Sequence, residues 1–248
     1  MAKKFFHIAI DGPVAAGKGT VSKLVAQRLG FLYVDTGAMY RVAAYLAQQN
    51  QVAYTEEQKI VDLIKSSKIE MRTPLADPVK PSQKSKSIVS EQDGRLITVL
   101  LNGEDISWKI RTEEISQGAS KVSVLPKVRK ILVEKQQKIA HGQNVVMEGR
   151  DITYRVLPKA DLKIFLTADV RERAKRRLLQ LQLKGLDASL QEILQEIKER
   201  DTRDMNRKTD PLKIVPEAWK LDTTQLAIEK VVGKIVDKTK KMKTHNQK

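Results

Sequence analysis

Apolar residues gather in five short runs that are separated by longer amphipathic stretches. The clearest runs are nearly continuous rather than alternating, a pattern typical of parallel strands that are covered on both faces. Runs of this kind that alternate with helical patterns predict an α/β fold, with a five-stranded parallel sheet and helices on both faces. The expected strands are residues 5–10, 31–34, 144–147, 162–166 and, more weakly, 218–221, and the expected helices include residues 20–29, 127–140, 171–183 and 190–207.

The stretch from about residue 55 to residue 112 breaks this rhythm. Residues 73–90 are rich in Pro, Ser and Lys, and two β-prone runs flank Asp93-Gly94, which is a good hairpin signal. We therefore expect a small inserted antiparallel subdomain within an otherwise single domain of residues 1–248. Residues 241–248 are expected to form a disordered basic tail.

Composition excludes several classes of protein. The chain of 248 residues has no Cys, so disulfides, thiolate zinc sites and a Cys nucleophile are excluded. The three His residues are scattered, and no apolar run approaches the roughly 18 residues of a membrane span. These features predict a cytoplasmic protein without a membrane partner.

The formal net charge of +16 has two interpretations. Lys and Arg neutralise nucleic-acid phosphates, so the chain could bind RNA or DNA. Alternatively, it is an enzyme with a small phosphorylated substrate and a basic surface of little consequence. The eleven aromatic residues do not alternate with basic ones as in proteins that stack single strands, and residues 230–248 alone supply seven Lys against one Asp.

A glycine-rich turn follows the first strand and opens the first helix. Such a turn lets backbone N–H groups converge on phosphate oxygens at a helix N-terminus, and Lys18 adds a positive charge. The spacing is that of a P-loop, except that Gly19 stands where Ser or Thr normally follows the Lys, which leaves Thr20 as the nearest magnesium-contacting hydroxyl. An ordinary Gly-rich turn is the alternative. The residues of this turn are Gly12, Pro13, Val14, Ala15, Ala16, Gly17, Lys18, Gly19 and Thr20.

Two further strand ends carry polar residues, and ligands of open parallel sheets bind at the carboxyl ends of strands. Thr36 and Arg41 follow the second strand, where Arg41 could grip a phosphate as a bidentate fork. Glu148 ends the third strand and could hold magnesium through water. A capped helix start with a solvated Arg41, and a helix-capping neighbour at Glu148, are the alternatives.

The expected helix 190–207 changes character along one face. Its apolar stripe is Leu190, Ile193, Leu194 and Ile197, and steps of three and four then reach Arg200, Asp204 and Arg207. Charges on the inward side point toward a cleft that holds an anion, although a helix that runs past the core into water is the alternative. In the preceding helix, Arg173, Arg176 and Arg177 are expected to form a solvated face.

At these residues the sequence resembles the cytidylate kinase family of the nucleoside monophosphate kinases. The resemblance covers most of the chain in the family's order. The matching segments are residues 8–20, 35–41, 110–112, 126–129, 149–151 and 199–207.

The resemblance implies a P-loop kinase fold with a monophosphate-binding insertion and a helical lid at about residues 171–190. It implies transfer of the γ-phosphate of ATP to CMP or dCMP with Mg²⁺. We expect a monomer with no specific nucleic acid as partner. UMP or another small acceptor is the alternative substrate. The resemblance implies that Gly12 to Thr20 bind ATP and that the catalytic cations are Lys18, Arg150, Arg200 and Arg207. The residues implied to bind the acceptor phosphate are Thr36, Arg41, Arg150 and Arg207. The residues implied to read cytosine are Ser120, Arg129 and Asp151, and Asp204 is implied to contact the sugar.

One segment departs from the family pattern. After Gly149-Arg150-Asp151-Ile152 the family usually continues with Gly-Thr, whereas this chain has Thr153-Tyr154-Arg155. The loss of that Gly changes the backbone freedom of the loop that carries Arg150 and Asp151. The absence of Ser or Thr at Gly19, in contrast, is usual in this kinase group.

Overall fold

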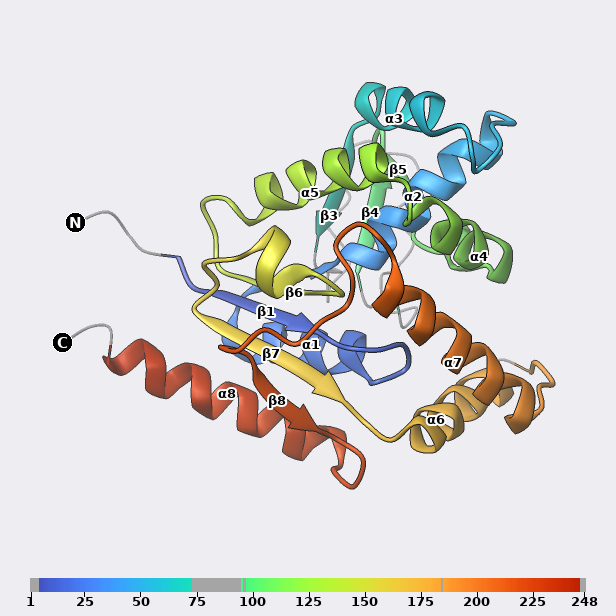
Figure 1. Ribbon diagram of the computed structural model, residues 1–248. Coiled ribbons are helices and arrows are strands. Elements are labelled where there is room, and N and C mark those ends of the chain that lie inside the picture. The colour runs from blue at the N-terminus through green and yellow to red at the C-terminus, as the bar shows by residue number, and fades with distance from the viewer. Residues whose placement is uncertain (1–4, 73–94, 96, 184, 246–248) are drawn as a thin grey trace, which may run out of the picture. The chain divides into compact units, whose positions relative to one another are not determined.

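The computed structural model describes residues 5–72, 95, 97–183 and 185–245 (Figure 1). Five strands form the main sheet in the order β2-β6-β1-β7-β8, and three shorter strands form a second, antiparallel sheet. All five strands expected from the apolar runs are present, within one or two residues of the expected bounds. They are β1 (His7–Asp11), β2 (Leu32–Asp35), β6 (Val145–Gly149), β7 (Leu162–Thr167) and β8 (Trp219–Asp222).

The chain divides into two compact units, each with its own core. The first unit comprises Met1–Phe31 and Gln136–Lys248, and the second comprises Leu32–Lys135. The first unit contains strands β1, β6, β7 and β8. Its helical elements are α1 (Lys18–Leu29), the short helix η2 (Ile152–Val156), α6 (Val170–Gln182), α7 (Leu190–Asn206) and α8 (Ile228–His245), while α5 (Pro126–Ala140) crosses the boundary.

The register of the first unit aligns the carboxyl ends of β1 and β6, while the parallel strand β7 continues to Thr167. Asp11, the last residue of β1, is paired with Gly149 of β6 on one side and with Phe165 of β7 on the other. Strand β8 continues the sheet parallel to β7. The chain therefore leaves β1 and β6 at the same edge, and Gly12 and Arg150 begin their loops from neighbouring positions.

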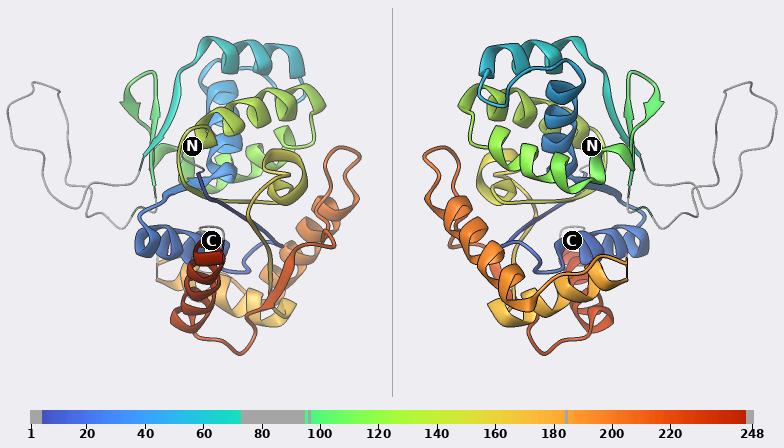
Figure 2. Two further views of the ribbon diagram at one scale, coloured as in Figure 1. Left: turned by 90° about the vertical axis from the view of Figure 1, so that its left-hand side faces the viewer. Right: turned by 90° about the vertical axis from the view of Figure 1, so that its right-hand side faces the viewer.

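Two pairs of helices lie side by side in the first unit. Helix α1 contacts α8, and α6 is followed by α7 as an antiparallel hairpin (Figures 1 and 2). A Ser189–Glu192 capping box starts α7, in which the Ser189 hydroxyl and the Glu192 carboxylate each accept a backbone N–H of the other residue. Ile193 and Ile197 of α7 pack with Ala174 of α6, so the apolar stripe holds the hairpin together.

Within the described residues, the second unit contains strand β2 of the main sheet, several helices and the antiparallel sheet. Helix α2 packs against its neighbours α3 and α4. The expected hairpin around Asp93-Gly94 lies outside the described residues. Besides β2 and the first part of α5, the elements of this unit are α2 (Thr36–Gln49), α3 (Glu57–Ser66), β3 (Ile69–Arg72), β4 (Thr98–Leu101), β5 (Glu104–Asp105), the short helix η1 (Lys109–Arg111) and α4 (Glu113–Val122).

The structure corrects the expectation for the C-terminal tail. Helix α8 continues to His245, so residues 241–245 are helical rather than disordered. Apolar residues of its inner face, Val232 and Ile235 among them, are buried, and Lys238 and Lys243 stack over the rings of Trp219 and Phe31. The basic residues therefore sit on a helix that is packed onto the unit. Within the described residues, no helix is long and apolar enough to cross a membrane.

Candidate active site

The P-loop has the backbone that its glycines predict. Gly17 precedes α1 in the left-handed region with φ 85°, and Ala15 also has a positive φ of 57°. A Cβ on Gly12 would lie 2.0 Å from the carbonyl oxygen of Leu166 in β7, so only glycine fits there. The loop is therefore held close to the sheet and turns directly into the N-terminus of α1, which is the arrangement that binds phosphate.

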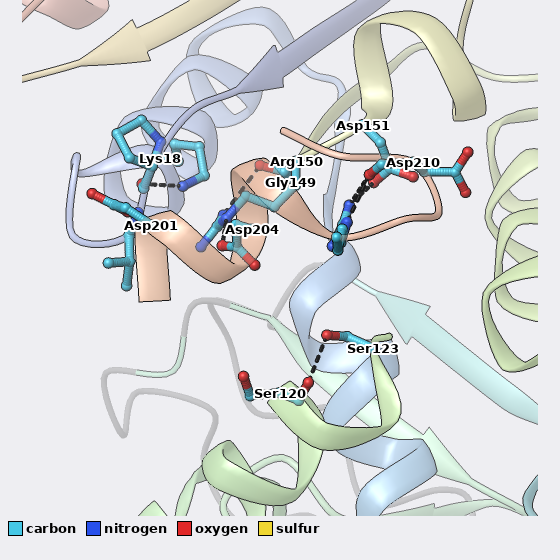
Figure 3. A network of polar contacts seen from close by, with 12 residues as sticks. Lys18, Ser120, Ser123, Gly149, Arg150, Asp151, Asp201, Asp204 and Asp210 are labelled. Carbon is cyan, nitrogen blue, oxygen red and sulfur yellow. Dashed lines mark hydrogen bonds and ion pairs between the residues drawn. The ribbon is translucent and has the colours of Figure 1, made fainter. Parts of the chain in front are cut away.

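Lys18 is buried at the start of α1, and its ammonium donates to the carbonyl oxygen of Pro13 at 2.8 Å (Figure 3). Burial lowers the pKa of Lys18 to about 7, and the nearby positive charge of Arg150 lowers it as well. Glu148 and other acidic groups act in the opposite direction and raise this pKa. The Lys18 side chain thus contacts an uncharged carbonyl oxygen of the loop rather than a carboxylate. An anion at the loop would favour its charged form.

Asp11 occupies a role that the sequence analysis did not assign. Its fully buried carboxylate accepts from the backbone N–H groups of Ile152 and Thr153 at 2.9 and 2.8 Å, and from the Thr153 hydroxyl at 2.7 Å. Burial raises the pKa of Asp11 to about 6, although these hydrogen bonds lower it in part. Asp11 therefore caps η2, whereas the Asp151 side chain makes no capping bond there.

Arg150, in the loop that follows β6, forms an ion pair at 2.7 Å with Asp204 of helix α7 (Figure 3). The side chains are only 19% and 13% exposed. Burial alone would raise the pKa of Asp204, but the Arg150 guanidinium outweighs it and holds that pKa below its usual value, with help from Arg207 and Arg200. The sequence-predicted cations Arg150, Arg200 and Arg207 therefore all favour the ionised form of one carboxylate.

Arg207 follows the last turn of α7 and is almost fully buried. Its Nη2 lies 3.7 Å from a carboxylate oxygen of Asp151, and its Nε donates to the carbonyl oxygen of Asp210 at 2.7 Å. The side chains of Asp204 and Arg207 are only 13% and 5% exposed, so they lie on the inner side of the helix end rather than in water.

The solvated face expected for α6 is wrong for Arg173. This side chain is buried and pairs with Asp201 of α7 at 2.6 Å, and its guanidinium also donates to the carbonyl oxygens of Ala168 and Val14. Asp201 in turn accepts from the backbone N–H of Val14 at 3.2 Å. The pair therefore holds both backbone polar groups of one P-loop residue. A step of four from Ile197 along the apolar stripe would have found Asp201.

In the second unit, the predicted residues lie at the start of α2 and in the segment from α4 to α5. Asp35 caps α2 by accepting from the Ala38 N–H at 3.0 Å, and Arg41 lies 3.4 Å from the same carboxylate with a side chain only 25% exposed. Thr36 is buried beside them. Arg41 is therefore not the solvated side chain of the alternative interpretation.

Arg129 at the start of α5 is buried within the second unit. Its guanidinium donates to the carbonyl oxygen of Ser123 at 3.0 Å and lies 5.5 Å above the ring of Tyr40. The Ser123 hydroxyl donates to the carbonyl oxygen of Ser120 at 2.9 Å (Figure 3). The backbone around Ser120 is thus fixed to the turn that Arg129 also holds.

The metal candidates supply oxygen donors of the kind that hard cations prefer. Glu148 is buried at the end of β6, and Thr20 is half-buried in the first turn of α1. One carboxylate and one hydroxyl fit a cation that takes most of its ligands from phosphates and water. Among the described residues, no group of three or more His, Cys, Asp or Glu side chains is arranged to hold a metal alone.

A family model described as cytidylate kinase matches residues 8–241. The chain belongs to the cytidylate kinase family. The cytidylate kinase of Caldicellulosiruptor bescii is 43% identical over 94% of this chain and 95% of the relative. That of Caldanaerobacter subterraneus is 45% identical over 94% of each chain. A shikimate kinase structure from Acinetobacter baumannii is 13% identical over 94% of this chain and 92% of that one, with a TM-score of 0.41.

Membership of the cytidylate kinase family makes the chain a nucleoside monophosphate kinase, an enzyme that uses ATP and a divalent metal. The P-loop kinase fold predicted from sequence is confirmed by the family and by the topology of the two sheets. The family match includes the loop at Thr153-Tyr154-Arg155, so this departure is a local feature of a family member.

The Arg150–Asp204 pair predicts how stability depends on pH. Because the folded pKa of Asp204 is lowered, its contribution is fully present above the pKa of an unfolded Asp, about 4, and is lost as pH falls through the folded pKa. Asp204→Asn should therefore lower the free energy of unfolding by about 2 kcal/mol at pH 7. In chemical denaturation, the difference from wild type should shrink below about pH 4.

The exposed Asp187 provides the control, because Asp187→Asn removes a carboxylate that lies away from this pair. A difference between Asp204→Asn and wild type that stays constant from pH 7 to pH 3 would contradict the assignment.

The Arg173–Asp201 pair predicts a large loss of stability for Arg173→Met. The substitution leaves a buried carboxylate without its cation, which typically costs about 3–5 kcal/mol. Arg171→Met removes an exposed guanidinium from the same helix and should cost little. Adding Asp201→Asn to Arg173→Met should recover part of the loss in urea denaturation. Equal stabilities of the Arg173 and Arg171 variants would show that the pair does not stabilise the fold.

Proposed function

We propose that this enzyme transfers the γ-phosphate of ATP to CMP or dCMP. An oxygen of the acceptor phosphate forms the new bond to the γ-phosphorus, and the bond from that phosphorus to the β–γ bridging oxygen breaks. The products are ADP and CDP or dCDP. The observation that carries the proposal is the alignment of a P-loop with the partly buried Arg150–Asp204 pair in a member of the cytidylate kinase family.

Phosphoryl transfer needs alignment and positive charge more than covalent help from the protein. We propose that residues Gly12 to Thr20 bind the ATP phosphates and that Lys18 leaves the Pro13 carbonyl to contact them. Arg150, Arg200 and Arg207 supply positive charge around the transferring group. All three charges favour the ionised form of Asp204, and this carboxylate offsets part of the repulsion among the guanidinium groups before substrate binds.

The acceptor roles are proposed from the family resemblance and the local geometry. Thr36, Arg41, Arg150 and Arg207 would bind the acceptor phosphate, and Asp204 would meet the sugar. Ser120, Arg129 and Asp151 would read cytosine. The Asp151 side chain makes no capping hydrogen bond, because Asp11 accepts from the N–H groups of the following turn, and this supports the assignment of Asp151 to the base.

For the divalent metal we propose Mg²⁺, with Thr20 and Glu148 as the residues that hold it directly or through water. When bound, Mg²⁺ neutralises phosphate charge and orients the β- and γ-phosphates. The Thr20 hydroxyl takes the place of the Ser or Thr hydroxyl that normally follows the P-loop Lys, where this chain has Gly19. The carboxylate of Glu148 is available at the strand end beside Gly149, where the loop of Arg150 begins.

We also propose that residues 55–112 form the monophosphate-binding insertion and residues 171–190 a lid. Closure of a lid would exclude water, which otherwise competes with CMP as acceptor. A cytosolic monomer that needs no partner other than its substrates fits this small-molecule chemistry.

Two alternatives are separated by one set of assays. A kinase for another small acceptor would consume ATP fastest with UMP, AMP or shikimate, whereas we expect CMP and dCMP to be preferred. A nucleic-acid-binding protein, suggested by the +16 charge, would bind RNA with a steep salt dependence and turn over CMP poorly.

Lys18→Met serves as the reference variant in the same acceptor panel. It removes the positive charge at the ATP phosphates, and we expect it to retain the fold and lose transfer by at least about a hundredfold with every acceptor. Circular dichroism and a melting curve check the fold. Near-normal turnover by folded Lys18→Met would remove the assignment of the P-loop to ATP.

Asp151→Asn should reduce the preference for cytosine over uracil. A carboxylate accepts the N4 amino group of cytosine but faces the O4 acceptor of uracil, and a buried mismatch of this kind costs about 1–3 kcal/mol. The Asn amide can donate to O4, so CMP activity should fall and the CMP-to-UMP ratio of kcat/KM should narrow. Steady-state kinetics with both nucleotides measure the ratio. If the ratio stays at the wild-type value in a folded variant, Asp151 does not read the base.

A further inference from the structure

The segment that follows α7 holds Arg207 by a backbone carbonyl. Arg207 donates from Nε to the carbonyl oxygen of Asp210 at 2.7 Å, and its Nη2 contacts the same oxygen. Asp210 reaches this position in the left-handed region with φ 48°, a conformation that non-glycine residues adopt rarely. The Leu212 N–H then donates to the carbonyl oxygen of Asp204 at 2.8 Å. The segment thus folds back onto the end of α7.

Two residues of the π-helical turn η2 contact this segment. The Tyr154 hydroxyl donates to the carbonyl oxygen of Pro211 at 2.5 Å, and the Lys213 ammonium lies 4.3 Å from the centre of the Tyr154 ring. Arg155 forms an ion pair with Asp210 at 3.5 Å, but its side chain is half exposed, so this contact contributes little. Tyr154 therefore supplies the main contacts between η2 and the segment.

Tyr154 is placed to act on Arg207 through two neighbouring segments. It fixes the carbonyl next to that of Asp210, which accepts from the Arg207 guanidinium. It also belongs to the turn that begins immediately after Asp151, whose carboxylate the same guanidinium contacts. A strained residue such as Asp210 persists only where its surroundings determine it, and the contacts of Tyr154 with the next residue do so.

We propose that Tyr154 is a positioning residue for Arg207 and thereby sets the affinity for the acceptor phosphate. The proposal rests on the proposed function, in which Arg207 binds the phosphate of CMP. Tyr154 itself does not touch the reacting atoms in this scheme. Its hydroxyl keeps the Asp210 carbonyl in place, so that the Arg207 guanidinium is oriented before the acceptor arrives.

Tyr154→Phe tests the proposal because it removes only the hydroxyl and retains the ring beneath Lys213. Losing one hydrogen bond of this kind should raise KM for CMP roughly three- to tenfold. The values of kcat and of KM for ATP should stay within about twofold of wild type. Tyr54→Phe is the matched control, since Tyr54 also has a lysine, Lys121, near its ring but lies in the other unit.

A second measurement separates positioning from a general structural role. Combined with Arg207→Lys, Tyr154→Phe should raise KM for CMP no further, because its effect runs through the guanidinium. Equal changes of KM for ATP and CMP, or an unchanged KM for CMP in folded Tyr154→Phe, would overturn the proposal. The proposal would also be overturned if Tyr154→Phe raised KM for CMP by the same factor in the Arg207→Lys background as it does alone.

The same experiment distinguishes a failure of the proposed function. If wild type does not phosphorylate CMP but uses another acceptor of the panel, the proposed function is wrong. The KM of that acceptor then replaces the KM of CMP in the comparison, and its change in Tyr154→Phe still decides the role of Tyr154.

Discussion

A charge buried in a protein is stable only beside a partner, and the arrangement around the P-loop follows from this constraint. Asp201 and Arg173 are both buried, and each is satisfied by the other and by the backbone of Val14. Removing one of them leaves the other charge without compensation. The hairpin of α6 and α7 is consequently fixed to the loop at its base by a contact that neither helix could make alone.

The sheet determines which loops can cooperate. Because Asp11 and Gly149 are paired in register, the P-loop and the loop of Arg150 start side by side, and the carboxylate of Asp11 reaches across to close the turn after Asp151. Helix α7 adds the third component through Asp204, the partner of Arg150. Strand register, rather than proximity in sequence, thus assembles residues that are separated by more than 130 positions.

The sequence predicted the strands well because buried parallel strands are apolar throughout, and it predicted the P-loop because glycines are required there. It also placed Asp204 on the inner face of its helix. Asp201 lies on the same stripe and was predictable, but Arg173 resembles a solvated residue until its partner is known. Asp11 lies at the end of a strand, and its partners Ile152 and Thr153 are far away in the sequence. The Tyr154 hydroxyl likewise contacts a segment more than fifty residues away. No local sequence pattern therefore reveals the role of Asp11 or of Tyr154.

Helix α7 fixes the distance and direction between two of its charged side chains. A helix rises about 1.5 Å and turns about 100° per residue, so Asp201 and Asp204 stand about 4.5 Å apart along its axis with a fixed difference in direction. One inserted residue between them would rotate Asp204 away from Arg150 while Asp201 stayed on the P-loop. We therefore expect a change of helix length between Ile193 and Asp204 to separate these two contacts, because it would alter the spacing of the charged residues relative to the apolar residues that hold the hairpin.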